Sequence, residues 1–106
     1  MIGRPFTGTV PSATTSVTAA ASALLNTLHG AVSGTDLTFN ANLARLTLIP
    51  RSGATVNWNI GGAAVDDTMP VIPSGGISFD CTKAVADTIY VHSDTAGVNL
   101  DVIQHI

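Results

Sequence analysis

The chain carries few side chains that could form an active site or a metal centre. Its three histidines, His29, His92 and His105, lie far apart and form no His-x-His or His-Glu-x-x-His motif. A zinc site would need folding to bring them together, and the single cysteine, Cys81, supplies at most one thiolate. We therefore expect no bound metal, and no glycine-rich phosphate loop or other motif predicts a cofactor.

Carboxylates and hydroxyls show no catalytic spacing either. Asp66 and Asp67 are the only adjacent carboxylates, and their neighbours lack the alternating oxygen ligands of a calcium loop. Residues 73–76 contain a serine, but a nucleophile elbow needs Gly-x-Ser-x-Gly before a helix, and here a strand is predicted to follow. The chain has no glutamate, so a glycosidase would have to use aspartates such as Asp80 and Asp101. We expect that the protein is not an enzyme.

One aromatic segment allows two interpretations. Residues 57–59 read Asn-Trp-Asn, which could bind a sugar if Trp58 faced solvent beside Tyr90. Alternation along the strand instead places Trp58 with Val56 and Ile60 on the buried side. We favour the core position and keep a carbohydrate-binding module as an alternative function.

The elements around these residues are predicted to be mostly strands. Residues 42–60 alternate with period two on either side of a turn at Pro50–Gly53, which predicts a β-hairpin. Further short strands are expected at 36–40, 77–81, 88–92 and 98–103, with 69–72 at an edge or bulge because prolines flank it.

A different period occupies residues 18–30. Leucines and alanines there recur at helical spacing, Thr18 could cap the start and Gly30 could follow the end, which predicts a helix of about three turns. The fold class expected is therefore all-β: a small antiparallel β-sandwich or jelly-roll-like module with one short helix in its N-terminal third. We expect a single domain over residues 16–106, preceded by residues 1–15 as an N-terminal arm or an edge strand.

Period two also predicts which side chains share the core. The inward positions of the expected strands are Leu37, Phe39, Leu46, Leu48, Val56, Trp58, Ile77, Phe79, Ile89, Val91, Leu100 and Val102. Tyr90 offers an alternative register for its strand, in which Tyr90 would face the core in place of Ile89 and Val91.

The charge content restricts the possible partners. Only 10% of the residues are charged and the net charge is −3, whereas charged residues make up about 25% of ordinary domains. A net negative chain lacks the basic face that nucleic acids need. No apolar run is long enough to span a membrane, and the N-terminus lacks the apolar core of a secretory signal. Such a neutral surface suits a protein packed against copies of itself or a scaffold.

From about residue 16 to residue 104 the order of motifs resembles a group of small bacteriophage virion proteins. The matching segments are Ser22–Gly30 (SALLNTLHG), Ala44–Pro50 (ARLTLIP), Ala54–Trp58 (ATVNW), Ile72–Asp80 (IPSGGISFD) and Asp87–Gln104. The resemblance implies a compact β-sandwich in the virion, assembled in the host cytoplasm.

Within the virion, the role favoured is a capsid cement or decoration protein. A neck, tail or baseplate accessory protein is the alternative. The expected partners are other copies of the chain, with a trimer favoured, and the major capsid protein or another virion protein. Ile2, Arg4 and Phe6 in the arm are the candidate lattice or subunit contacts.

Overall fold

The computed structural model describes residues 11–19, 23–28, 30, 37–51, 55–62, 69–93 and 98–106. In chain order its elements are β1 (Pro11–Ala19), β2 (Ala23–Leu24), the 3-10 turn η1 (Leu25–Thr27), β3 (Arg45–Pro50), β4 (Asn57–Ile60), β5 (Ile77–Asp80), the helix α1 (Lys83–Ala86), β6 (Ile89–His92) and β7 (Val98–His105). None of the helices in this part of the chain is long and apolar enough to cross a membrane.

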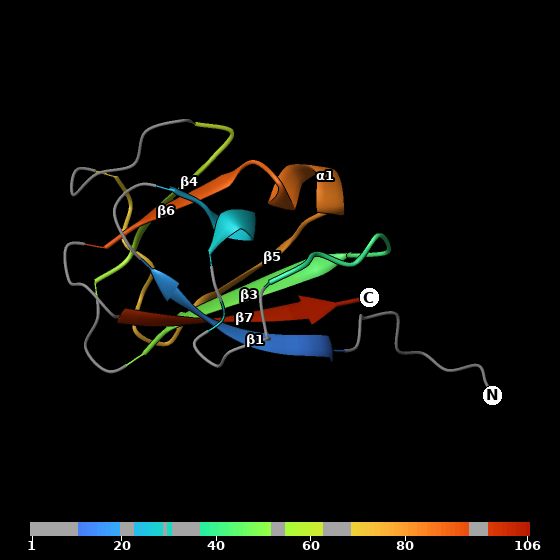
Figure 1. Ribbon diagram of the computed structural model, residues 1–106, viewed down its shortest axis with the longest axis horizontal. Coiled ribbons are helices and arrows are strands. Elements are labelled where there is room, and N and C mark those ends of the chain that lie inside the picture. The colour runs from blue at the N-terminus through green and yellow to red at the C-terminus, as the bar shows by residue number, and fades with distance from the viewer. Residues whose placement is uncertain are drawn as a thin grey trace.

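The strands form two antiparallel sheets. One has four strands in the order β1-β7-β3-β5, and the other has three in the order β2-β6-β4. Figure 1 shows the four-stranded sheet low in the view, with β4 and β6 above it and α1 at one end. The predicted all-β class is confirmed.

The hydrophobic core draws on both sheets, and all twelve listed inward positions belong to it or pack against it. Ile60, which alternation also placed on the buried side, is 41% exposed. Ile89 and Val91 are fully buried while Tyr90 is half-buried, so the alternative register of that strand does not occur. Trp58, Ile77 and Phe79 are only partly buried and pack on the cluster from its margin. Further buried members are Leu25, Leu28, Leu43, Ile72, Cys81 and Ala86.

The predicted hairpin over residues 42–60 is wrong, although both of its strands exist. β3 pairs with β5 and β7, whereas β4 pairs with β6 in the other sheet. The chain therefore crosses from one sheet to the other after Pro50. Alternation reports that a strand has one buried face, but a crossing strand and a returning strand bury that face equally well.

The predicted three-turn helix over residues 18–30 is also wrong. Thr18 belongs to β1, Leu24 to β2, and the described residues of this region contain a single helical turn, the 3-10 turn η1. The β-branched residues of β1 favour a strand, and β7 offers it a long pairing partner. A short isolated helix gains too little from local bonds to compete. Leu25 and Leu28 still reach the core.

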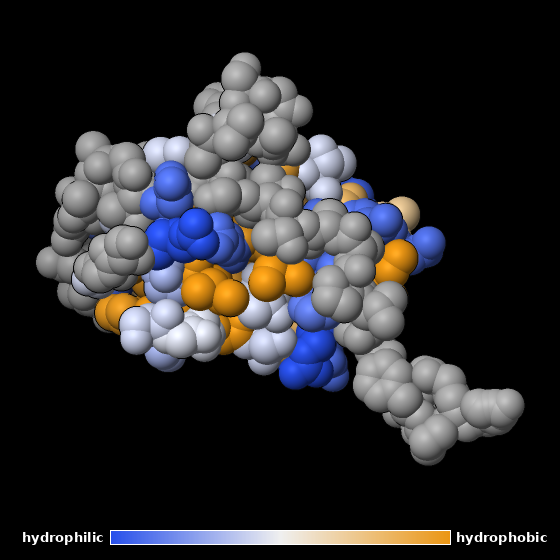
Figure 2. All heavy atoms as spheres, turned by 90° about the horizontal axis from the view of Figure 1, so that it is seen from below, coloured by the Kyte–Doolittle hydropathy of each residue, from blue (hydrophilic) through white to orange (hydrophobic). Residues whose placement is uncertain are grey.

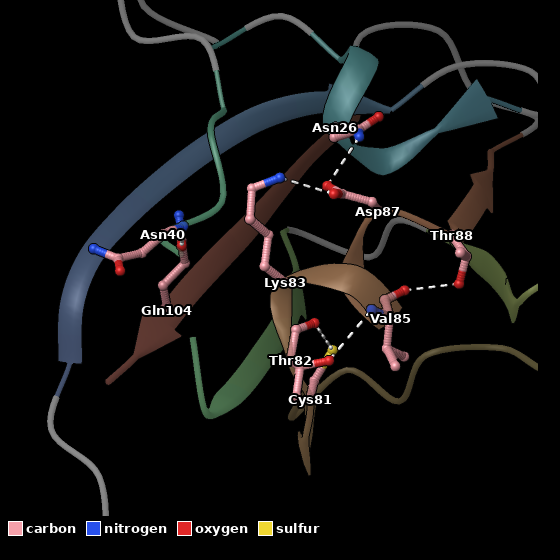
Figure 3. Close-up of polar contacts among 9 residues, drawn as sticks. All are labelled: Asn26, Asn40, Cys81, Thr82, Lys83, Val85, Asp87, Thr88 and Gln104. Atoms are coloured by element: carbon pink, nitrogen blue, oxygen red, sulfur yellow. Dashed lines mark hydrogen bonds and ion pairs between the residues drawn. The ribbon is translucent and has the colours of Figure 1, made fainter. Parts of the chain in front are cut away.

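Helix α1, which the sequence did not predict, is fastened to η1 by polar contacts. The Thr82 hydroxyl caps its start by accepting a hydrogen bond from the Val85 N–H. Asp87 accepts from Lys83 Nζ at 2.8 Å and from Asn26 Nδ2 at 3.1 Å (Figure 3). The hydrogen bonds from Lys83 and Asn26 hold the pKa of the Asp87 carboxyl below its ordinary value.

Gln104 fastens the segment 37–40 to the end of β7. Its side chain is buried, its Oε1 accepts from the Asn40 N–H and its Nε2 donates to the Thr38 carbonyl, both at 2.7 Å. Figure 3 shows the Gln104 side chain reaching from β7 toward Asn40. A strand was expected at residues 36–40, but residues 37–40, the described part of that range, form none. Leu37 and Phe39 are nevertheless buried, as predicted.

Residues 11–15 of the expected arm belong to β1, an edge strand that continues to Ala19. The expected domain boundary at residue 16 therefore falls inside this strand. Residues 1–10, and with them the candidate contacts Ile2, Arg4 and Phe6, lie outside the described part of the chain.

Candidate functional site

The surface carries a hollow beside the edge strand β4. It measures about 230 Å³ and is lined by Trp58, Asn59, Ile60 and Pro70. The Trp58 ring stacks on Phe79, with 5.4 Å between ring centroids and 23° between ring planes. Trp58 lies on β4 and Phe79 on β5, the edge strands of different sheets, so the two rings bridge the sheets beside the hollow.

Exposed apolar side chains adjoin this hollow. Ile60, in its lining, is 41% exposed, and Val71, which follows the lining residue Pro70, is 51% exposed. None of the described side chains that line the hollow is ionisable. We call Trp58, Ile60, Pro70 and Val71 the apolar rim. A rim of this kind suits contact with another apolar surface.

Hydrogen bonds hold the apolar rim in place. The Trp58 N–H donates to the Pro70 carbonyl at 3.0 Å, and the Ile72 N–H donates to the Val56 carbonyl at 2.8 Å. The buried Asn57 side chain donates to the Met69 carbonyl at 2.8 Å. Residues 69–72 therefore run alongside β4 as a partial extra strand, in agreement with the edge position predicted for them.

The geometry does not form the aromatic platform that sugar binding would use. Trp58 lies opposite Val91 in the β4–β6 pair, while Tyr90 lies opposite Asn59. Adjacent residues of a strand point to opposite faces, so Trp58 and Tyr90 belong to different faces of the sheet. Trp58 packs on the core and Phe79, as the alternation predicted.

A second polar arrangement lies on the outward face of the four-stranded sheet. His105 Nε2 and Thr47 Oγ1 are 3.0 Å apart, and Thr47 Oγ1 is 2.9 Å from Ser78 Oγ. Arg45 donates from Nε to Ser78 Oγ at 2.9 Å and pairs with Asp80 at 3.1 Å. Every member is at least partly exposed. The chain of contacts therefore ties three strands together on an open surface and does not form a shielded catalytic centre.

The remaining candidates of the sequence are dispersed. Cys81 is buried, and burial raises the pKa of its thiol, which makes it a poor nucleophile. Asp101 pairs with Arg51 at 2.9 Å. His92 lies in β6, away from His105 in the other sheet. His29, Asp66 and Asp67 lie outside the described residues, and within those residues no three His, Cys, Asp or Glu side chains are placed to hold a metal ion.

The apolar surface is not confined to the rim. Figure 2 views the molecule from below Figure 1 and shows hydrophobic residues, in orange, in a broken band among hydrophilic ones.

The sequence did not predict the exposure of Ile60, because alternation placed it inward with Trp58. Ile60 is the last residue of the edge strand β4, and it lies opposite the fully buried Ile89 of β6. Its position next to Gly61 and Gly62 was the one sequence signal for this.

Comparison with known proteins yields no relative: no family model, no curated protein and no solved structure matches this chain.

Proposed function

We propose that this protein is a structural component of a bacteriophage particle, namely a capsid cement or decoration protein that binds the head lattice. The observation that carries the proposal is the apolar rim: Ile60 and Val71 are exposed beside a hollow whose described lining residues carry no charge, on a β-sandwich whose chain has only 10% charged residues. Such a surface is unfavourable in water and favourable in an assembly.

The resemblance of the motif order to that of small virion proteins is the reason for choosing a phage particle. The firm hydrogen bonding of residues 69–72 to β4 supports a preformed contact surface, which loses little conformational entropy on binding. The proposed partners are the major capsid protein and other copies of the chain, with a trimer as the favoured state. Residues 1–15, with Ile2, Arg4 and Phe6, are proposed to contribute to the lattice contact.

A particle-binding assay tests this function. Particles of the encoding phage that lack the protein would be mixed with purified protein, sedimented, and imaged by cryo-electron microscopy. We expect the protein to bind at regular positions on the head and to raise the temperature at which the head releases its genome. Binding at the neck or tail instead would support the accessory-protein alternative, and the absence of binding would refute a virion role.

Matched variants test whether the apolar rim makes the contact. Ile60→Lys changes a rim residue that is 41% exposed, while Val85→Lys changes an α1 residue that is 40% exposed and lies outside the rim. Both replace an exposed apolar side chain, so both should fold. We expect Ile60→Lys to raise the Kd for particles at least about tenfold, a loss of about 1.4 kcal/mol of binding free energy, and Val85→Lys to bind normally. Equal binding by both variants would exclude the rim.

The arm is tested separately by deleting residues 2–10. The deletion should leave the sandwich folded, as judged by circular dichroism, and should weaken particle binding. Full binding by the deletion variant would show that Ile2, Arg4 and Phe6 are not the lattice contacts.

A further inference from the structure

The four strands at the edges of the two sheets differ in how well they are protected against pairing with another chain. β2 has only two residues, β5 carries the exposed Asp80, and β4 is covered in part by residues 70–72. β1 has nine residues, PSATTSVTA, with no charge and with its proline at the first position. Natural edge strands are usually kept short, charged or covered, so β1 is the edge most suited to accept another strand.

The hydrogen bonds of β7 show which backbone groups of β1 are available. The Asn99 and His105 carbonyls accept from Arg51 and Ala44 on the β3 side, so alternate residues of β7 direct their backbone groups toward β3. Asn99, Asp101 and Ile103 lie opposite Thr18, Ser16 and Thr14, and there is no bulge between them. The N–H and C=O groups of these three β1 residues therefore point away from β7, where no other described strand lies.

The sequence of β1 is nearly symmetric about Ser16. Residues 13–19 read Ala-Thr-Thr-Ser-Val-Thr-Ala. If two copies pair antiparallel about Ser16, Ala13 meets Ala19, Thr14 meets Thr18, and Thr15 meets Val17, which has nearly the same shape. Ser16 meets its own copy. No position brings together two charges or two side chains of very different size.

We propose that β1 pairs with β1 of a second copy, antiparallel and centred on Ser16, to join two four-stranded sheets into one continuous sheet. In this register Thr14, Ser16 and Thr18 all occupy hydrogen-bonded positions, and each can donate and accept one backbone hydrogen bond across the interface. Cross-strand pairs of threonine and serine are favourable in sheets. A two-fold axis makes the contact self-complementary.

This contact goes beyond the proposed virion function and does not depend on it. A closed trimer contains no two-fold axis, so the β1 contact would join two trimers if a three-fold contact also forms. The isolated protein should therefore have an even number of copies, a dimer or a hexamer, when measured by light scattering after gel filtration. A monomer or a trimer that persists at high concentration overturns the proposal, whatever the result of particle binding.

Cysteine cross-linking tests the register. Two paired residues at the centre lie about 5.5 Å apart at Cα, within the range of about 4.4–6.8 Å that a disulfide needs. Ser16→Cys should therefore form a covalent dimer under mild oxidation. Thr14→Cys is the matched control, because position 14 lies about 14 Å from its own copy in this register. A mixture of Thr14→Cys and Thr18→Cys should again cross-link. Wild-type protein controls for the buried Cys81.

A charge variant tests the contact without oxidation. Ser16→Lys places two like charges opposite each other at the centre, and we expect the Kd of the dimer to rise at least about tenfold. Ser78→Lys, on the edge strand β5 of the same sheet, should leave the dimer intact, and thermal unfolding should show that both variants are folded. Equal cross-linking by Ser16→Cys and Thr14→Cys would overturn the register. A dimer that forms only after residues 1–10 are deleted would show that they cover this edge, and would also overturn the proposal.

Discussion

Replacing Trp58 with alanine should remove a side chain that bridges β4 and β5, the edge strands of the two sheets. Trp58 packs on the core, stacks on Phe79 at 5.4 Å, and is partly exposed where it lines the hollow. A fully buried tryptophan costs about 3–5 kcal/mol when it is truncated to alanine, and the exposed part of Trp58 lowers the packing loss to about 2 kcal/mol. The stacked pair adds about 0.5–1.5 kcal/mol. We therefore expect the free energy of unfolding to fall by about 3 kcal/mol.

Urea denaturation followed by far-ultraviolet circular dichroism measures this loss without relying on tryptophan fluorescence. In a domain of this size a loss of about 3 kcal/mol lowers Tm by roughly 12–20 °C. Trp58→Phe keeps an aromatic ring and should lose only about 1 kcal/mol. Ile60→Ala, at the exposed end of the same strand, should stay within about 0.5 kcal/mol of wild type.

A double-mutant cycle isolates the contact between the two rings. Trp58→Ala and Phe79→Ala should be less than additive by about 0.5–1.5 kcal/mol, because each change removes the same stacked pair. Unchanged stability in Trp58→Ala, or full additivity in the cycle, would refute the conclusion that this pair closes the sandwich.

Four other predictions follow from individual contacts. Gly76→Ala should lower the free energy of unfolding by about 2–3 kcal/mol, because Gly76 has φ +88° and a Cβ there would lie 2.8 Å from the Leu48 carbonyl oxygen. Gly75→Ala, where a Cβ would meet open space, should be nearly neutral in the same urea titration. Gln104→Leu should lower the free energy of unfolding by about 2–4 kcal/mol, because the Asn40 N–H and the Thr38 carbonyl would lose their hydrogen bonds to the Gln104 side chain. Hydrogen exchange should then show faster opening of the segment 37–40. The pKa of Asp87 is lowered on folding, so the carboxylate stabilises the fold fully above its ordinary pKa near 3.8, and this stabilisation disappears as the pH falls through the pKa of the folded state. Wild type should therefore have a higher Tm than Asp87→Asn at pH 6, and the difference in Tm should close in acid. A difference in Tm that does not change with pH would contradict the ion pair. Elemental analysis of purified protein should find no stoichiometric metal, as the scattered histidines predict; one ion per chain would contradict this.

Much of the core could be predicted from the sequence, because burial in a sheet follows a local rule. Apolar and polar residues alternate along a strand that has one buried face. The residues next to them in the sequence were therefore enough to place Leu46, Leu48, Leu100 and Val102 in the core. The same rule placed Trp58 correctly with the core. It failed for Ile60, because alternation cannot show that β4 lies at the edge of its sheet.

Sequence signals for the candidate surfaces were weaker. The prolines around residues 69–72 indicated an edge, but the hollow depends on Trp58 and Pro70, which only the β4 pairing brings together. The scattered hydroxyls of Thr47 and Ser78 meet His105 only because β3 pairs with both β5 and β7. Such contacts depend on strand order, which no local pattern encodes.

The sequence by itself determined that the chain is an all-β module with a neutral surface, and it determined most of the residues that form the core. The tertiary structure alone decided which strands are partners. It separated β3 from β4, turned the helical pattern after Thr18 into strands and a 3-10 turn, and left β1 at an edge. The physical reason is that hydrophobic periodicity is set by neighbours along the chain, whereas strand order is set by which distant faces and backbone groups satisfy one another in the whole fold.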